Sequence, residues 1–255
     1  MITLRRQITM NLKNKIAVIT GGGRGLGRAL AETLAQEGAH VVICSRSLEE
    51  LKETCAKIQS SGGSCDYQKI DVTKESQIKN FIDTTIKNFA KIDILINNAG
   101  FAHSPKHIEK ITSKEYQRSI KTNIDSIFYF LKAALPKIKK QKTGTIITIS
   151  SAAGKRGHPR FSVYSASKFA GLGLTQAVAK ELETFDIKCI AICPGGINTE
   201  MRRKAFGQED SRKQQSPEIV ANIIKDIILG KITAPNGSDI EIRDGRITAI
   251  RHHQS

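Results

Sequence analysis

Short apolar segments alternate with amphipathic helical segments along nearly the whole chain, and this alternation constrains the fold more than any other feature. The apolar segments cover residues 15–20, 41–44, 65–70, 92–96, 145–149, 187–193 and 240–242. Helical patterns separate them, at about 26–37, from Ser47 onward, 74–89, from Thr112 to about 139, 162–183 and 217–229. Capping boxes are predicted at the start of two of these helices, Ser47 to Glu50 and Thr112 to Glu115. Wholly apolar strands that alternate with helices indicate a parallel sheet covered on both faces. We therefore expect one α/β domain built on a doubly wound parallel sheet.

The turn after the first strand is rich in glycine and reads Thr20-Gly-Gly-Gly-Arg-Gly-Leu-Gly27. Glycines at 21, 25 and 27 allow a tight turn, a close approach to a pyrophosphate, and packing of the next helix against the strand. The helix N-terminus adds amide donors and a positive dipole end. The spacing Thr-Gly-x3-Gly-x-Gly differs from the common G-x-G-x-x-G pattern. Its place between the first strand and the first helix nevertheless predicts a dinucleotide-binding turn.

The end of the second strand indicates which dinucleotide binds. A site for NAD places Asp or Glu there, whereas a site for NADP uses arginine on the 2′-phosphate. Here the chain reads Val42-Ile-Cys-Ser-Arg46-Ser47 and has no acid before Glu49. Arg24, inside the glycine turn, is a second basic candidate. We therefore predict NADP (NADPH) as the cofactor.

Tyr164 and Lys168 are four residues apart on a predicted helix, so they lie on one face of it. A nearby ammonium favours the phenolate and brings the phenol into range for proton transfer. Ser151 follows the fifth strand, where ligands bind in doubly wound sheets. Its hydroxyl would donate a hydrogen bond to a substrate carbonyl. The three residues together predict acid–base chemistry on a carbonyl or alcohol.

With these motifs the chain resembles the short-chain dehydrogenase/reductase family over residues 14 to 245. The matching pieces are Thr20 to Gly27, Asp71-Val72, Asn97-Asn-Ala-Gly100, Asn123, Ser151, Tyr164-x3-Lys168 and Pro194-Gly-Gly-Ile-Asn-Thr199. The resemblance implies a Rossmann-like fold, a homotetramer or homodimer, and reversible hydride transfer between NAD(P) and a carbonyl or alcohol. Within this family, the chain is similar in particular to the 3-oxoacyl-[acyl-carrier-protein] reductases.

The resemblance also implies roles for individual residues. Tyr164 resembles the general acid/base, and Lys168 resembles the lysine that tunes the acidity of this tyrosine and binds the nicotinamide ribose. Ser151 resembles the residue that orients the carbonyl, and Asn123 resembles the residue that holds a relay water. Asp71 and Val72 resemble the pair that flanks the adenine. With Tyr164 and Lys168, the implied cofactor contacts are Gly21, Gly23, Arg24, Gly25, Leu26, Gly27, Ser45, Arg46, Asp71, Val72, Asn98, Ala99, Gly100, Pro194, Gly195, Ile197 and Thr199.

The formal charge is +16, from 40 Lys and Arg against 24 Asp and Glu. Such a surface attracts polyanions, including an acidic carrier of substrate, but the simpler and favoured interpretation is that the basic residues are scattered over solvated faces. The sequence has no zinc finger, no aromatic RNA-binding motif and no tryptophan, so we expect no specific nucleic-acid partner. No apolar run is long enough to span a membrane.

The cysteines and histidines give no sign of a metal site. The five cysteines (44, 55, 65, 189 and 193) lack metal spacing, and their odd number suggests reduced thiols in a cytoplasm. We expect Cys44 and Cys193 to be small core residues. We expect His103, His107 and His158 to be surface residues in loops beside the site.

Two segments lie outside the regular pattern. Residues 1–13 are interpreted as an N-terminal extension, and residues 14–250 as the domain. Residues 200–216 are interpreted as a short polar lid over the substrate, with Met201, Ala205 and Phe206 as its apolar contacts. The C-terminal Asp244-Gly-Arg246 replaces the common Asp-Gly-Gly in a region that builds an oligomer contact in relatives.

The favoured function is an NADP-dependent carbonyl reductase, with a 3-oxoacyl group on an acyl carrier as substrate. The enzymatic alternative is a reductase or alcohol dehydrogenase for a free small molecule. The non-enzymatic alternative is an NADP-sensing regulatory protein, and the intact set of Asn123, Ser151, Tyr164 and Lys168 argues against it.

Overall fold

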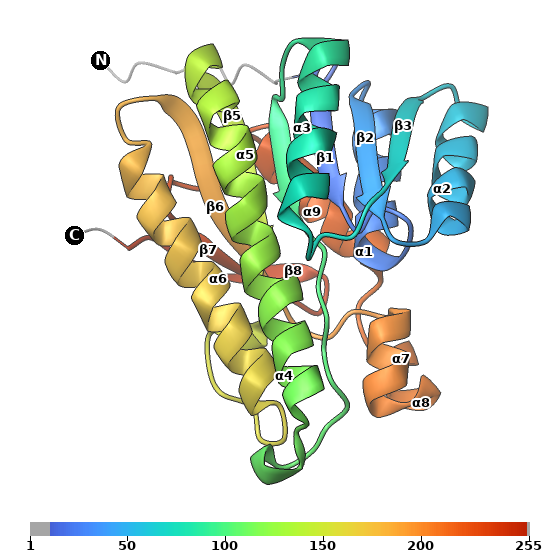
Figure 1. Cartoon of the computed structure of the whole chain (residues 1–255), viewed down its shortest axis with the longest axis vertical. Coiled ribbons are helices and arrows are strands. Elements are labelled where there is room, and N and C mark those ends of the chain that lie inside the picture. The colour runs from blue at the N-terminus through green and yellow to red at the C-terminus, as the bar shows by residue number, and fades with distance from the viewer. Residues whose placement is uncertain (1–10, 254–255) are drawn as a thin grey trace.

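One eight-stranded sheet organises the chain in the computed structural model, which describes residues 11–253. The strands lie in the order β3-β2-β1-β4-β5-β6-β7-β8, and helices cover the sheet on both sides (Figure 1). The strands are β1 (Ile16–Thr20), β2 (His40–Ser45), β3 (Ser64–Lys69), β4 (Ile94–Asn97), β5 (Thr143–Ile149), β6 (Asp186–Pro194), β7 (Asp239–Arg243) and β8 (Arg246–Arg251). Strands β1 to β7 are parallel. The predicted doubly wound α/β fold is confirmed.

The α-helices of the described residues are α1 (Gly25–Gln36), α2 (Leu48–Ser60), α3 (Glu75–Phe89), α4 (Ser113–Ile120), α5 (Ser126–Gln141), α6 (Ser162–Glu181), α7 (Glu200–Phe206), α8 (Gln208–Arg212) and α9 (Pro217–Ile228). Six of them pack into two hydrophobic cores, one on each face of the sheet. Side chains of α1, α2 and α9 belong to one core. Those of α3, α5 and α6 belong to the other.

Alternation along the strands explains why both faces need cover. In β1, Ala17 and Ile19 enter the core of α1 and α9, whereas Ile16 and Val18 enter the core of α3 and α5. Full burial of one such aliphatic side chain stabilises the fold by roughly 1.5–3 kcal/mol. The order reverses between β1 and β4, and ligands bind in the crevice that such a reversal opens at the carboxyl ends of the strands.

The C-terminal strand was not predicted. β8 pairs antiparallel with β7, so the expectation of an entirely parallel sheet is wrong at this edge. The two strands are joined by Asp244 and Gly245, which both have positive φ (48° and 71°). Asp-Gly is a common two-residue hairpin turn because it tolerates this backbone conformation.

The long helix predicted from Thr112 to about residue 139 is divided. Thr112 forms the predicted capping box with Glu115 at the start of α4. A turn of π-helix over Lys121–Asp125 then separates α4 from α5. Such turns insert an extra residue into a helix and are frequent at functional sites. The inserted turn contains Asn123.

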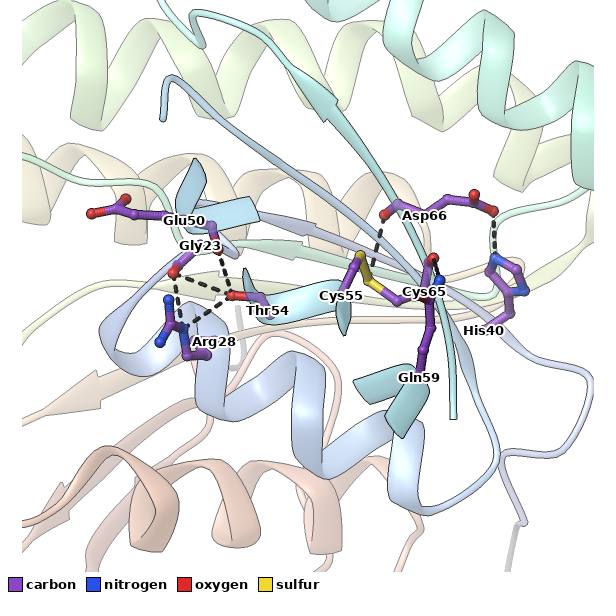
Figure 2. The surroundings of a disulfide bond; sticks show 9 residues. All are labelled: Gly23, Arg28, His40, Glu50, Thr54, Cys55, Gln59, Cys65 and Asp66. Carbon is purple, nitrogen blue, oxygen red and sulfur yellow. Dashed lines mark hydrogen bonds and ion pairs between the residues drawn. A yellow bond between two sulfur atoms is a disulfide. The ribbon is translucent and has the colours of Figure 1, made fainter. Parts of the chain in front are cut away.

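Two expectations about the periphery need correction. Cys55 on α2 and Cys65 at the start of β3 form a disulfide (Figure 2), with Cα atoms 5.2 Å apart, so the expectation of reduced thiols is wrong for this pair. Cys44, Cys189 and Cys193 are free and buried. Leu12, inside the predicted extension, is 1% exposed and packs in the core. The remainder of that extension, residues 1–10, lies outside the described residues.

Within residues 11–253, none of the helices combines the length and the apolar character needed to cross a membrane.

We predict that replacing both Cys55 and Cys65 by serine lowers the free energy of unfolding by about 2–4 kcal/mol, because the crosslink restricts the unfolded chain. Urea unfolding of the oxidised protein and the variant measures the difference, and dithiothreitol should bring the parent protein to the level of the variant. Titration of all five cysteines as thiols in the unfolded, unreduced protein would contradict the prediction.

Candidate active site

The glycine turn has the shape that a pyrophosphate needs. Gly21 and Gly25 have positive φ (68° and 54°), which glycine adopts without strain. A Cβ on Gly27 would lie 2.1 Å from the carbonyl oxygen of Gly21, so only glycine fits. The side chain of Arg24 does not cap the first amides of α1, and they are donors for an anion. Leu26 is buried beneath the turn.

Thr20 joins this turn to the end of β4. Its hydroxyl accepts hydrogen bonds from the backbone N–H groups of Asn98 (2.9 Å) and Ala99 (2.8 Å). The Asn98 side chain in turn donates to the carbonyl oxygen of Thr20 (2.8 Å). These bonds hold Asn98, Ala99 and Gly100 beside the glycine turn. The structure thus brings together two segments that the sequence separates by more than seventy residues.

The two predicted arginines have different surroundings. Arg24 is 2.8 Å from Glu200 and 3.3 Å from Glu50, so its guanidinium already faces two carboxylates. The predicted capping box at Ser47 is therefore only half formed. The Ser47 hydroxyl accepts a hydrogen bond from the Glu50 backbone N–H, but the Glu50 side chain faces Arg24 and does not return a bond to the Ser47 backbone. Arg46 is exposed and borders a cavity of about 510 Å³.

That cavity lies where the adenosine end of a dinucleotide was predicted. Its lining consists of Arg46, Gln68, Lys69, Ile70, Asp71, Ser76, Gln77 and Asn80. Partial burial acts to raise the pKa of Asp71, but hydrogen bonds from Thr73 and the charge of Arg46 hold it below its usual range. Val72 is buried next to it, and Ser45 precedes Arg46 at the end of β2. Lys69 was not predicted as a residue of this site. The signal in the sequence is its position at the carboxyl end of β3, because β3 pairs with β2 and their ends lie side by side.

The predicted catalytic residues gather at the carboxyl ends of β4 and β5. Tyr164 and Lys168 share one face of α6, with the Lys168 Nζ 5.9 Å from the centre of the Tyr164 ring. That Nζ donates to the Ile149 carbonyl oxygen (2.9 Å) at the end of β5. Ser151 follows β5, and its Oγ accepts from the Ala153 amide (3.1 Å).

Asn123 stands at the back of this group and is 1% exposed. Its amide oxygen accepts from the Phe101 N–H (2.8 Å). Its Nδ2 donates to the Phe101 carbonyl and to Ser167 Oγ (both 2.8 Å). The Asn123 side chain therefore joins the π-helical turn, the loop after Gly100 and α6.

Burial dominates the ionisation of the pair on α6. It raises the pKa of the Tyr164 phenol above its ordinary value, and the Ser151 hydroxyl and the charge of Arg202 oppose it. The expected lowering by Lys168 is therefore not what governs Tyr164 here. Burial lowers the pKa of Lys168 to about 8, and Cys193 acts in the opposite direction. Lys168 thus keeps most of its charge at neutral pH.

The segment after β6 leads from the sheet to the lid. Pro194 ends β6, and the Gly195 amide donates to the Ile242 carbonyl (2.8 Å). Ile197 bridges to Gln215. Thr199 caps α7 by accepting from the Arg202 amide, and its side chain lies where a Cβ on Gly25 would point. Thr199 therefore lies beside the glycine turn, and the predicted contacts of these four residues with the nicotinamide stay a prediction.

An aromatic cluster beside Tyr164 was not predicted as a unit. His103 is 1% exposed, so its expected surface position is wrong; His107 is exposed and His158 half-buried. The His103 ring stacks on Phe161 (centroids 5.5 Å apart), and Phe161 stacks on Phe206 of the lid (5.1 Å). Phe161 also meets the Tyr164 ring edge-on (6.1 Å).

Comparisons with known proteins agree with this geometry. The family described as short chain dehydrogenase matches residues 15–210. The chain is 30% identical to the 3-oxoacyl-[acyl-carrier-protein] reductase of Thermotoga maritima, over 93% of this chain and 100% of that protein. It is 35% identical to a 3beta-hydroxysteroid dehydrogenase of Mediterraneibacter gnavus, over 78% and 71%. The crystal structure of levodione reductase superposes with a TM-score of 0.87 at 26% identity, covering 92% of this chain and 98% of that one.

We predict that Thr20→Val destabilises the fold and weakens binding of NAD(P)H, whereas Thr20→Ser does neither. Valine has no oxygen to accept from the Asn98 and Ala99 amides, and a buried donor without a partner costs roughly 1–3 kcal/mol. Urea unfolding and titration of NADPH fluorescence measure the two effects. Equal stability and affinity of the valine and serine variants would show that the two bonds do not hold the turn.

Proposed function

Because the chain belongs to the short-chain dehydrogenase family, we propose that it reduces a carbonyl substrate with NADPH and oxidises the corresponding alcohol in reverse. One observation carries the proposal: the glycine turn and the group of Ser151, Tyr164 and Lys168 open at the same edge of the sheet, joined through Asn98 to Gly100. A regulatory protein that only senses NADP has no use for a half-buried phenol and a buried ammonium at this edge.

Each residue of the group has a distinct task in this reaction. Tyr164 donates its phenolic proton to the carbonyl oxygen as the carbonyl carbon is reduced. The Ser151 hydroxyl donates a hydrogen bond to the same oxygen and orients it. Lys168 places a positive charge near the phenol and, in the family, also binds the nicotinamide ribose. NADPH, when bound along the glycine turn, supplies the hydride.

Asn123 supports the proton path through its backbone. Its side-chain amide is committed to Phe101 and Ser167. A relay water would therefore donate a hydrogen bond to the backbone carbonyl oxygen of Asn123, in the π-helical turn, and would not bind the Asn123 side chain. In this proposal the water connects Lys168 with solvent and restores the proton to Tyr164.

We predict that Tyr164→Phe lowers kcat by roughly 10²–10⁴-fold, the usual contribution of general acid–base catalysis, while NADPH still binds. Steady-state reduction assays and NADPH fluorescence separate the two quantities. The matched control is Tyr67→Phe, an exposed tyrosine on β3, which should behave as the parent protein. More than about a tenth of the activity left in Tyr164→Phe would remove Tyr164 as the acid.

The preference for NADPH is proposed from the charges around the cavity at β2 and β3. Arg46 and Lys69 both border it, and Asp71 is the acid among its lining residues. Asp71 is already held by hydrogen bonds from Thr73, so it is not placed like the acid that an NAD site puts at the end of β2. Arg24 contributes less than predicted because Glu50 and Glu200 face it.

We expect kcat/KM with NADPH to exceed that with NADH by at least about tenfold, since a bidentate arginine–phosphate contact is strong and specific. Arg46→Asp should weaken NADPH and leave NADH unchanged. Lys52→Asp, a charge reversal at an exposed position of α2, is the control and should alter neither. Equal use of the two cofactors by the parent protein would refute the preference.

For the substrate we propose a 3-oxoacyl group carried on an acidic acyl carrier. The Thermotoga maritima reductase, aligned over its whole length, and the net charge of +16 support it. A free small ketone is the second candidate. The aromatic cluster of His103, Phe161 and Phe206 favours this smaller substrate, because the cluster narrows the space beside Tyr164.

Salt separates the two substrates. The Debye length falls from about 10 Å at 0.1 M to 3 Å at 1 M, so kcat/KM for the carrier-linked substrate should fall steeply as salt rises, through slower encounter. A thioester of N-acetylcysteamine has no carrier to attract and should change little. Identical salt profiles for both would count against the carrier.

We further propose a homodimer or homotetramer that acts in the cytoplasm. Exposed Tyr116, Phe128 and Phe169, on α4, α5 and α6, support association through these helices. A reducing cytoplasm would keep Cys55 and Cys65 as thiols, so the disulfide observed here is the feature that speaks against that location.

A further inference from the structure

Ser151 begins a short turn, residues 151–155, whose geometry sets the direction of its hydroxyl. A 3₁₀ turn over Ala152–Gly154 follows Ser151, and Ser151 Oγ accepts a hydrogen bond from the Ala153 N–H (3.1 Å). The Gly154 N–H donates to the Ser151 carbonyl oxygen (2.8 Å). A hydroxyl that accepts from an amide keeps its own proton free to donate. The position of the Ser151 turn therefore decides where this proton points.

The first end of the Ser151 turn is fixed by packing against β6 and α6. The Ser150 N–H donates to the Ile192 carbonyl oxygen (2.7 Å), and Ser150 Oγ donates to the Lys168 carbonyl oxygen (2.9 Å). Gly154 packs so closely here that a Cβ on it would lie 2.5 Å from Ser150 Oγ. After Lys155 the next two residues are exposed. The position of the second end therefore depends on what holds Lys155.

A buried ion pair holds Lys155. Its Nζ lies 2.7 Å from Asp239 Oδ2, and the two side chains are 12% and 1% exposed. Asp239 begins β7, two places from β5 in the sheet, so the pair connects distant strands. The same carboxylate oxygen is hydrogen-bonded to His253, which follows β8. The C-terminal hairpin thus meets the Ser151 turn at one carboxylate.

The burial of this pair suits it to positioning more than to stability. Removing two charges from water costs much of what their attraction returns, so a buried pair is weak evidence for stability. The attraction is, however, screened much less than at the surface. An ion pair that is buried less, Lys15 with Asp93, lies just before β1 and β4, at the edge of the sheet opposite the site, and its lysine side chain is 37% exposed.

We propose that Lys155 and Asp239 are positioning residues for Ser151. Their ion pair fixes the turn that presents the Ala153 N–H to Ser151 Oγ, and so directs the Ser151 proton toward the substrate carbonyl. The inference rests on the proposed function, in which Ser151 orients that carbonyl. It adds that β7, which lies on the other side of β6 from the site, takes part in arranging the reaction. Both residues act through Ser151 and touch no substrate.

A double-mutant cycle between the ion pair and Ser151 tests the proposal. Lys155→Met/Asp239→Asn removes both charges, which avoids the strongly destabilising case of one buried charge without a partner. We expect kcat for reduction of 3-oxobutyryl-N-acetylcysteamine, or of a cyclic diketone if it is turned over faster, to fall roughly ten- to a hundredfold, since a displacement of about 1 Å can cost 10²-fold. NADPH affinity, measured by fluorescence, should not change, because β7 lies four places from β1 in the sheet.

The Ser151→Ala background separates positioning from a merely structural role. In that background the double replacement should cause no further loss of kcat, because the hydroxyl that it displaces is already absent. An equal fold-loss in both backgrounds, or parent-like kcat in Lys155→Met/Asp239→Asn, would overturn the proposal. Full activity of Ser151→Ala alone would instead refute the role of Ser151 in the proposed function.

Single changes at the more exposed partner repeat the comparison with less risk to folding. Lys155→Arg keeps the charge and should retain most of kcat, whereas Lys155→Gln should lose it. Lys15→Met, which breaks the ion pair at the opposite edge of the sheet, is the matched control and should keep the kcat of the parent protein. Equal kcat in the arginine and glutamine variants would show that the charge of Lys155 does not position Ser151.

Discussion

The contact between the end of β1 and the end of β4 is the constraint on which the rest of the structure depends. Thr20 accepts from two backbone amides of the neighbouring strand exit, and Gly27 lies too close to the Gly21 carbonyl to carry a side chain. Because the strand order reverses here, the crevice opens at this point. The glycine turn, the half-buried Tyr164 phenol and residues 200–216 all take their positions from this crevice. Glu200 and Thr199 even attach the lid to the glycine turn itself.

Patterns that repeat along the chain could be predicted from the sequence. The alternation of apolar strands and amphipathic helices specified the sheet, since each strand must bury both faces, as Ala17 and Val18 do in opposite cores. The glycine turn was predictable because positive φ at Gly21 and Gly25 limits the residue type. Tyr164 and Lys168 share a helix, and their common face follows from helical spacing. Local rules of this kind also located Ser151 at a strand end.

Features that depend on contacts between distant segments could not be predicted in the same way. Nothing in the local sequence shows that Glu50 and Glu200 would meet Arg24, or that Phe206 would stack on Phe161. The burial of His103 follows from that cluster and not from its own loop. The Cys55–Cys65 bond requires α2 and β3 to be placed first (Figure 2). β8 is different, because its signal is local: Asp244-Gly245 is a typical hairpin turn, but the apolar periodicity of the chain does not show it.

Hydride transfer is tested most directly by isotope transfer from the cofactor. NADPH carrying deuterium at both C4 positions of the nicotinamide would be incubated with the protein and with a panel of 3-oxoacyl thioesters and cyclic diketones. Mass spectrometry of the alcohol product then locates the label. We expect one deuterium per product molecule on the former carbonyl carbon, for at least one substrate class. Tight binding of NADPH without transfer of the label to any of them would contradict it and would point to a protein that binds the dinucleotide without using it.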